Sequence, residues 1–174
     1  MAAKALAFAI LTAARTGEVI GADWREIDLA GAVWTVPAER MKGGREHRVP
    51  LSKPALALLG ELSRQASGPV FASERGALSN MALLMTLRRM GRADITVHGF
   101  RSTFRDWGAE RTAFPREVAE AALAHAIGDK VEAAYRRGDL FEKRRKLMEA
   151  WGAYCTTPAA AERGAVVALR KPIG

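Results

Sequence analysis

One strand-rich stretch interrupts a sequence whose other periodic segments have the spacing of helices. It lies between residues 27 and 51 and contains three short apolar or β-branched runs, at 27–29, 33–36 and 48–51. Glycines separate these runs, as expected for short antiparallel strands with tight connections. The segment from Met41 to Arg48 then forms an exposed, basic hairpin. The chain is therefore predicted to contain one small antiparallel sheet.

The rest of the chain is predicted to be largely helical. Apolar residues recur at helical spacing in stretches bounded by capping residues, prolines or glycines, namely 2–14, 16–23, 52–65, 80–90, 97–111, 115–126, a segment after Asp129, and 140–154. The fold class is thus mainly α with a small antiparallel β-sheet (α+β). We expect one domain over residues 1–155. Residues 156–174 have little periodicity, so they form a loosely ordered tail.

Charge and composition favour a nucleic-acid partner. The 174 residues have a formal net charge of +8 at pH 7. A small domain this basic attracts polyanions, nucleic acid before anionic membrane. The apolar run at residues 5–11 is too short to span a membrane. Cys155 is the only cysteine, so the chain forms no internal disulfide, which suits a reducing cytoplasm.

The chemistry available to the chain is that of its side chains. One cysteine and three scattered histidines do not have the spacing of zinc ligands. The sequence also has no glycine-rich phosphate loop of the nucleotide-hydrolase type and no serine elbow. We therefore expect any catalysis to proceed with no metal and no cofactor.

His98 and Arg101 form the first candidate pair. They lie three residues apart in a predicted helix and therefore share one of its faces. Arginine offers a planar fork of donors that matches phosphate oxygens, and histidine can donate to a phosphate or transfer a proton near neutral pH. Taken alone, the pair is better explained by a half-buried histidine beside a surface arginine.

Two upstream segments could add to such a site. Arg15 lies where an apolar helix ends, and Glu18 could either occupy a first helical turn or orient an arginine. Lys42 lies in the glycine-rich hairpin, where a lysine is usually solvated but can also protonate a leaving oxygen. The same hairpin has three further basic residues that suit contacts with DNA phosphates, namely Arg45, His47 and Arg48.

His125 and Tyr135 lie further along the chain. His125 closes a predicted helix, where a semi-buried structural histidine is the plain alternative. Tyr135 is one of two tyrosines, and Arg136 and Arg137 follow it directly. Neighbouring cations would stabilise a phenolate and the pentavalent phosphate that it attacks. Without that setting, Tyr135 would read as a core residue at helical spacing.

The order and spacing of these segments resemble the tyrosine recombinase (phage integrase) family. The shared features are Arg-Thr-Gly-Glu after an apolar helix, a lysine in a β-hairpin, His-x-x-Arg, a later Leu-Ala-His and then a tyrosine. Four further stretches look especially like integrases of prophages and genomic islands, namely residues 24–28, 37–42, 47–52 and 133–140. The resemblance extends to about Tyr154 and implies a recombinase catalytic domain over residues 1–155.

The resemblance implies a role for each matching residue. Arg15 and Arg101 would clamp the scissile phosphate, and Glu18 would support the site without contacting the phosphate itself. Lys42 would be the general acid at the departing 5′ oxygen. His98 would assist proton transfer at the tyrosine, and His125 would form a hydrogen bond with a phosphate oxygen. The nucleophile would be Tyr135, which would form a 3′-phosphotyrosyl link to DNA, while Arg136 and Arg137 would contact DNA.

The chain departs from the family pattern in two places. Family members usually have Gly before the second histidine, where this chain has Ala124, a small change that we expect to be tolerated. Full-length members also have a core-binding domain, often with an arm-binding domain, ahead of this region. Neither precedes residue 1 here, so we expect a catalytic domain from a longer protein or a truncated gene. Alone, it should bind DNA modestly and in a salt-dependent manner.

The expected partner is double-stranded DNA, and we expect no membrane partner. The resemblance implies a homotetramer on DNA for the full-length protein, a monomer for this chain alone, and a bacterial cytoplasmic, nucleoid-associated location. Two alternatives stay open at this point. One is a DNA-binding module made inactive by truncation. The other is a type IB topoisomerase-like enzyme, which shares the tyrosine chemistry but relaxes supercoils without partner sites.

Overall fold

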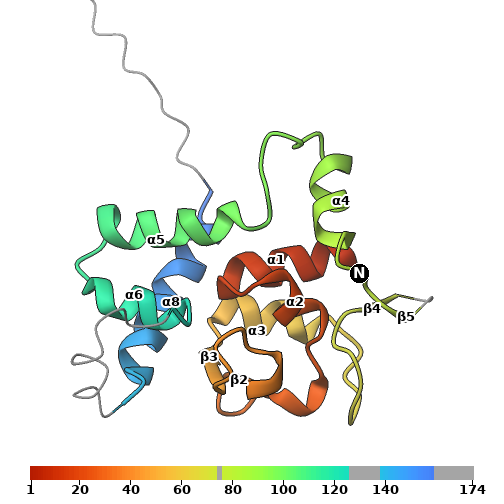
Figure 1. The fold of residues 1–174 in the computed structure, drawn as a ribbon, viewed down its shortest axis with the longest axis horizontal. Helices are drawn as coiled ribbons and strands as arrows, with labels where there is room; N and C mark the ends of the chain where they lie inside the picture. The colour runs from red at the N-terminus through yellow and green to blue at the C-terminus, as the bar shows by residue number, and fades with distance from the viewer. Residues whose placement is uncertain (74–75, 126–137, 159–174) are drawn as a thin grey trace, which may run out of the picture.

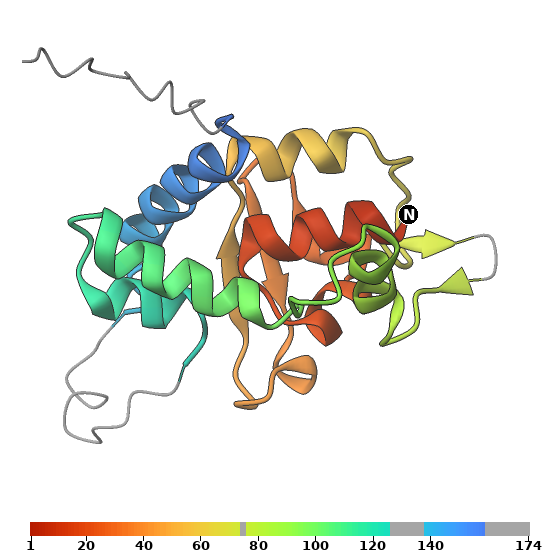
Figure 2. The same cartoon turned by 90° about the horizontal axis from the view of Figure 1, so that it is seen from above.

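A three-stranded antiparallel sheet lies at the centre of the N-terminal half (Figures 1 and 2). The computed structural model describes residues 1–73, 76–125 and 138–158. The strand order is β1 (Ile27–Asp28), β2 (Val33–Val36) and β3 (His47–Pro50), with Trp34 paired to both Ile27 and Val49. The sheet predicted from residues 27–51 is therefore confirmed. A second, two-stranded ribbon that the sequence did not indicate joins β4 (Ala72–Ser73) to β5 (Gly76–Ala77).

Helices make up most of the described structure, so the α+β fold class is confirmed. The described helices are α1 (Ala2–Thr12), α2 (Thr16–Ile20), α3 (Lys53–Gly60), α4 (Ala82–Arg89), α5 (Gly99–Arg111), α6 (Arg116–Ala122) and α8 (Phe141–Thr156), with 3₁₀ turns η1 (Trp24–Glu26) and η2 (Ala38–Arg40). In Figure 2, α1 crosses the sheet, while α5, α6 and α8 gather on one side of it. No helix in the described ranges has both the length and the apolarity needed to cross a membrane.

Two apolar clusters meet beside the C-terminal end of α1. In the first, Phe8 of α1 packs against Trp34 of the sheet and against Phe71. The second lies among α5, α6 and α8, where aromatic rings such as those of Phe104 and Trp151 meet edge to face. The two clusters are joined at α1, because the indole of Trp151 donates to the Ile10 carbonyl at 2.7 Å. The end of α1 is consequently held from both sides.

Several predicted helices are shorter than their sequence patterns suggested. The helix predicted to reach residue 65 ends at Gly60, and the helix predicted over 16–23 ends at Ile20. The helix predicted to continue to residue 126 ends at Ala122, because Ala124 adopts a left-handed conformation. α5 begins at Gly99, with His98 as its N-cap. Because α5 begins two residues later than predicted, His98 lies just before the first turn of the helix that contains Arg101.

Candidate functional site

Arg15 is fixed at the junction between α1 and α2. It is the N-cap residue of α2, and its backbone N–H donates to the Glu18 carboxylate at 2.9 Å. Its guanidinium donates to the other oxygen of the same carboxylate at 2.7 Å. Glu18 is buried, whereas 27% of the Arg15 side chain remains exposed. Glu18 therefore orients an arginine that can still reach a ligand.

Arg101 crosses from α5 to the ends of two other helices. Its side chain is buried, and its guanidinium donates to the carbonyls of Ala13 and Leu123, the latter at 2.7 Å. Its Nε has no hydrogen-bond partner among the described residues. Arg101 thus links the end of α1, where Arg15 begins the next helix, to the end of α6, where His125 follows.

The electrostatics of this junction favour an anion. Burial first, and then the positive charge of Arg15, lower the pKa of Arg101 to about 10, while Glu18 acts in the opposite direction. Arg101 therefore stays protonated at neutral pH. Two guanidinium groups whose charges repel each other lie near a single buried carboxylate, which is bonded to Arg15 alone, and this leaves an excess of positive charge. A phosphate placed between them would relieve that repulsion.

A cavity of about 250 Å³ brings three of the predicted residues together. Its lining includes His98, Arg101 and His125, with Arg105, Asp106 and Leu123 around them. His98 and Arg101, which were predicted to share a helix face, both line this cavity, although His98 is the N-cap of α5 and does not lie within the helix. His125, which is 24 residues after Arg101 in the sequence, reaches the same cavity from the end of α6.

The position of His125 is set by the way in which α6 ends. Ala124 has φ of 49°, and its N–H donates to the Ala121 carbonyl at 3.2 Å. The N–H of His125 donates to the Glu120 carbonyl at 3.0 Å. These two bonds form a Schellman motif, which normally has glycine in the left-handed position. The motif turns the chain so that the imidazole lies over the last turn of α6.

The left-handed alanine gives a stability prediction. Replacing Ala124→Gly should raise the free energy of unfolding by about 0.5–1 kcal/mol, because glycine avoids the left-handed strain but adds freedom to the unfolded chain. Urea unfolding monitored by circular dichroism measures the change. Ala121→Gly, in the helical last turn of α6, is the matched control and should lower stability by about 1 kcal/mol. Equal effects of both substitutions would contradict the motif.

His47 lies under the site rather than on the exposed part of the hairpin. Its ring is half-buried, and Nε2 contacts the Ala122 carbonyl at 3.2 Å. It lines a narrow interior space together with Glu18 and Arg101. Burial, followed by the charge of Arg144, lowers the pKa of His47 to about 4. His47 is therefore neutral at pH 7 and donates to a carbonyl at the end of α6.

The lowered pKa of His47 predicts acid sensitivity. Between pH 6.5 and about 4, unfolded chains take up a proton at His47 that the folded protein excludes, so stability should fall as the pH drops, by at most about 3 kcal/mol. His47→Gln keeps an amide donor for the Ala122 carbonyl but does not titrate. Urea unfolding at pH 7 and pH 5 should show a smaller pH effect for the variant. The same pH effect in both proteins would contradict this assignment.

The remaining predicted residues lie around this centre or outside the described ranges. Lys42 and Arg45 are exposed in the loop between β2 and β3. Arg48 is paired with Asp139 at 2.8 Å, and the buried Arg144 binds both that carboxylate and the Arg48 carbonyl. These contacts fix the start of α8 against β3. Three predicted residues lie outside the described residues, namely Tyr135, Arg136 and Arg137.

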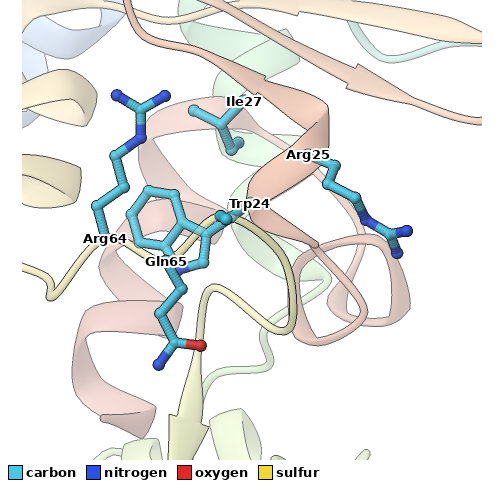
Figure 3. A pocket seen from close by; sticks show the side chains of 6 residues that line it. Trp24, Arg25, Ile27, Arg64 and Gln65 are labelled. Atoms are coloured by element: carbon cyan, nitrogen blue, oxygen red, sulfur yellow. The ribbon is translucent and has the colours of Figure 1, made fainter.

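A larger cavity, of about 500 Å³, lies elsewhere on the molecule (Figure 3). Trp24, Arg64 and Gln65 line it, and Figure 3 shows the indole of Trp24 beside the other two side chains. Arg25, which also lines it, is paired with Asp23. The lining contains no histidine, cysteine or tyrosine, so this cavity does not offer the chemistry found beside Arg101.

Comparisons with known proteins agree with the geometry. The model of the "Phage integrase family" matches residues 2–139. Prophage integrase IntA of Escherichia coli (strain K12) is 36% identical over 165 residues, which cover 91% of this chain and 39% of IntA. The integrase of Shigella phage Sf6 is 32% identical, over 80% of this chain and 38% of the relative. The chain therefore spans about two fifths of the length of these curated relatives.

A solved structure is similar in fold. The integrase from mycobacterium phage Brujita superposes with a TM-score of 0.66 at 19% sequence identity, covering 85% of this chain and 50% of that one. At this level of identity the likeness concerns the fold alone.

Proposed function

Because the chain belongs to the phage integrase family, we propose that it is the catalytic domain of a site-specific DNA recombinase. It would cleave and rejoin DNA strands in the integration or excision of mobile DNA. The observation that supports this proposal is that His98, Arg101 and His125 line one cavity, while Arg15, whose charge acts on Arg101, is held by the buried Glu18. That arrangement suits a phosphodiester group.

In the proposed reaction, the hydroxyl oxygen of Tyr135 attacks the scissile phosphorus. A bond forms between that oxygen and phosphorus, and the bond from phosphorus to the 5′ oxygen breaks. His98 assists removal of the tyrosine proton, and Lys42 donates a proton to the departing 5′ oxygen. The reverse attack by a 5′ hydroxyl of a partner strand rejoins the DNA. The phosphoester is exchanged and not hydrolysed, so the energy of the bond is retained without ATP.

Arg15, Arg101 and His125 act on the phosphate itself. The guanidinium groups donate to its non-bridging oxygens, whose negative charge grows as the fifth oxygen approaches. Glu18 holds Arg15 in place through two hydrogen bonds. Ala13 and Leu123 hold Arg101 through their carbonyls, so its guanidinium needs no reorganisation when the phosphate arrives.

Double-stranded DNA would be held by basic residues around this centre. We assign this role to the hairpin residues Arg45 and Arg48 and to Arg136 and Arg137. His47, which was expected to share it, is neutral and contacts α6 instead. Arg45 is exposed, whereas Arg48 is paired with Asp139, so we expect Arg45 to contribute most. In the full-length protein, four catalytic domains would act together on DNA in the bacterial cytoplasm.

The experiment that tests this function is capture of a covalent adduct. The substrate is a pool of randomly nicked genomic fragments from the source organism. In the fragments with a nick close to the cut, the short strand that ends in the 5′ hydroxyl diffuses away, and the adduct is trapped. The chain should yield a protein–DNA band that survives denaturation and disappears after protease treatment. A chain that binds the pool but yields no such band, even when joined to the rest of its full-length protein, would contradict the proposal.

A further inference from the structure

Glu120 makes an unusually close contact with His125. The carboxylate oxygen Oε2 lies 2.6 Å from Nδ1 of the imidazole, and the Glu120 carbonyl also accepts from the His125 backbone N–H at 3.0 Å. The same residue therefore fixes both the main chain and the ring of His125. Neither contact follows from the sequence, because a helical pattern through residue 126 would have placed the two side chains differently.

The second oxygen of Glu120 faces two arginines at longer range. Arg105 of α5 lies 3.9 Å from Oε1, and Arg116 of α6 lies 3.8 Å from it. These distances exceed those of direct hydrogen bonds, and both arginine side chains are more than half exposed. Exposed ion pairs of this kind contribute little. The short contact of the carboxylate is thus the one to His125.

We propose that Glu120 is a positioning residue for His125. Its carboxylate binds Nδ1 of the imidazole and so leaves Nε2 for the scissile phosphate. This inference rests on the recombinase function proposed above. The nitrogen that a histidine offers to a ligand is set by the hydrogen bond that its other nitrogen makes. With Nδ1–H donating to Glu120, Nε2 is the ring atom that remains for the cavity shared with Arg101 and His98.

The orientation of the ring decides which nitrogen can meet the phosphate. A neutral imidazole protonated at Nδ1 has only a lone pair at Nε2, whereas an imidazolium has an N–H at both nitrogens. In the form with two N–H groups, Nδ1 donates to Glu120 and Nε2 is the donor that remains for a phosphate oxygen. The other charged or titratable groups that line the cavity are His98, Arg101, Arg105 and Asp106.

The tautomer of His125 can be measured without any DNA reaction. Nitrogen-15 NMR at pH 8 distinguishes the two neutral forms of an imidazole, and His125→Asn identifies the signals among the three histidines. In the unmodified chain we expect the proton on Nδ1. Glu120→Gln retains an oxygen acceptor and should keep this form, whereas Glu120→Ala should shift it to the Nε2–H form. Glu110→Ala, on the exposed face of α5, is the control and should change nothing. A proton on Nε2 in the unmodified chain, or no shift in Glu120→Ala, would overturn the proposal.

A double-mutant cycle tests whether Glu120 acts through His125. Glu120→Ala should slow adduct formation by roughly 10- to 100-fold, as carboxylates behind functional histidines do elsewhere. In a His125→Ala background the same change should have less than about a twofold effect, because its partner is gone. Equal losses in both backgrounds would overturn the positioning role and assign Glu120 to the arginines. Were the unmodified chain to form no adduct at all, the proposed function would fail while the NMR result still decided the positioning of His125.

Discussion

Tyr135→Phe is expected to abolish covalent attachment to DNA while leaving DNA binding intact. The substitution removes only the oxygen that would attack the phosphorus, so contacts made by the basic residues persist. Of the two tyrosines in the chain, Tyr135 is the one followed by two arginines. Tyr154 has a different environment, because its ring packs against Trp151 and Trp107 with centroids 5.6 and 5.5 Å apart.

Tyr154→Phe is therefore the matched control for this prediction. It makes the same chemical change at a half-exposed ring near the end of α8, and it should retain adduct formation. Filter binding at low salt measures DNA affinity of both variants, and a denaturing gel measures the adduct. Adduct formation that survives Tyr135→Phe, or that is lost equally in Tyr154→Phe, would remove Tyr135 from the role of nucleophile.

Arg101→Lys is expected to slow adduct formation by roughly 10²–10³-fold, the loss typical of removing one donor from a preorganised anion site. Lysine retains the positive charge but cannot donate at once to the Ala13 carbonyl, the Leu123 carbonyl and a phosphate. The expected loss is therefore one of geometry and not of charge. Single-turnover cleavage at saturating protein separates this rate from any change in DNA affinity.

The free energy of unfolding has to be measured as well as the cleavage rate, because Arg101 also binds carbonyls at the ends of α1 and α6. A carbonyl that loses its donor in the interior costs about 1–3 kcal/mol, so the variant should unfold at lower urea concentration yet remain folded in its absence. Arg111→Lys, at the exposed end of the same helix, should change neither quantity. A folded Arg101→Lys variant that cleaves at the normal rate would show that Arg101 is a structural tie alone.

Much of the fold was predictable because it depends on local patterns. The alternation and short glycine-bounded runs at residues 27–51 indicated the sheet, and the apolar periodicity indicated most of the helices. Helix ends were less predictable. Ala124 stops α6 by adopting a left-handed conformation, which an alanine adopts only where surrounding contacts favour it. Only the family resemblance, in which glycine usually stands at this position, separates Ala124 from the alanines before it.

The sequence indicated candidate residues for the site but not their contacts. The pattern of Arg15, Glu18, His98, Arg101 and His125 indicated the residues of the site, and the structure places His98, Arg101 and His125 around one cavity. The contact of His47 connects segments that the sequence gives no reason to join, and the contact of Glu120 with His125 depends on the way in which α6 ends. His47 was expected on a DNA-facing loop, yet its ring contacts α6 across 75 residues of sequence. The role of Tyr135, which lies outside the described residues, stays a prediction.

The most direct test of the whole account is to identify the amino acid that carries the DNA. After adduct formation on nicked fragments and nuclease trimming, trypsin should release residues 131–136, which contain Tyr135, in a peptide separate from the one that contains Tyr154. Tandem mass spectrometry is predicted to find a 3′-linked nucleotide on the Tyr135 oxygen. A nucleotide on any other side chain, or a hydrolysed strand end with no modified peptide, would contradict the recombinase mechanism.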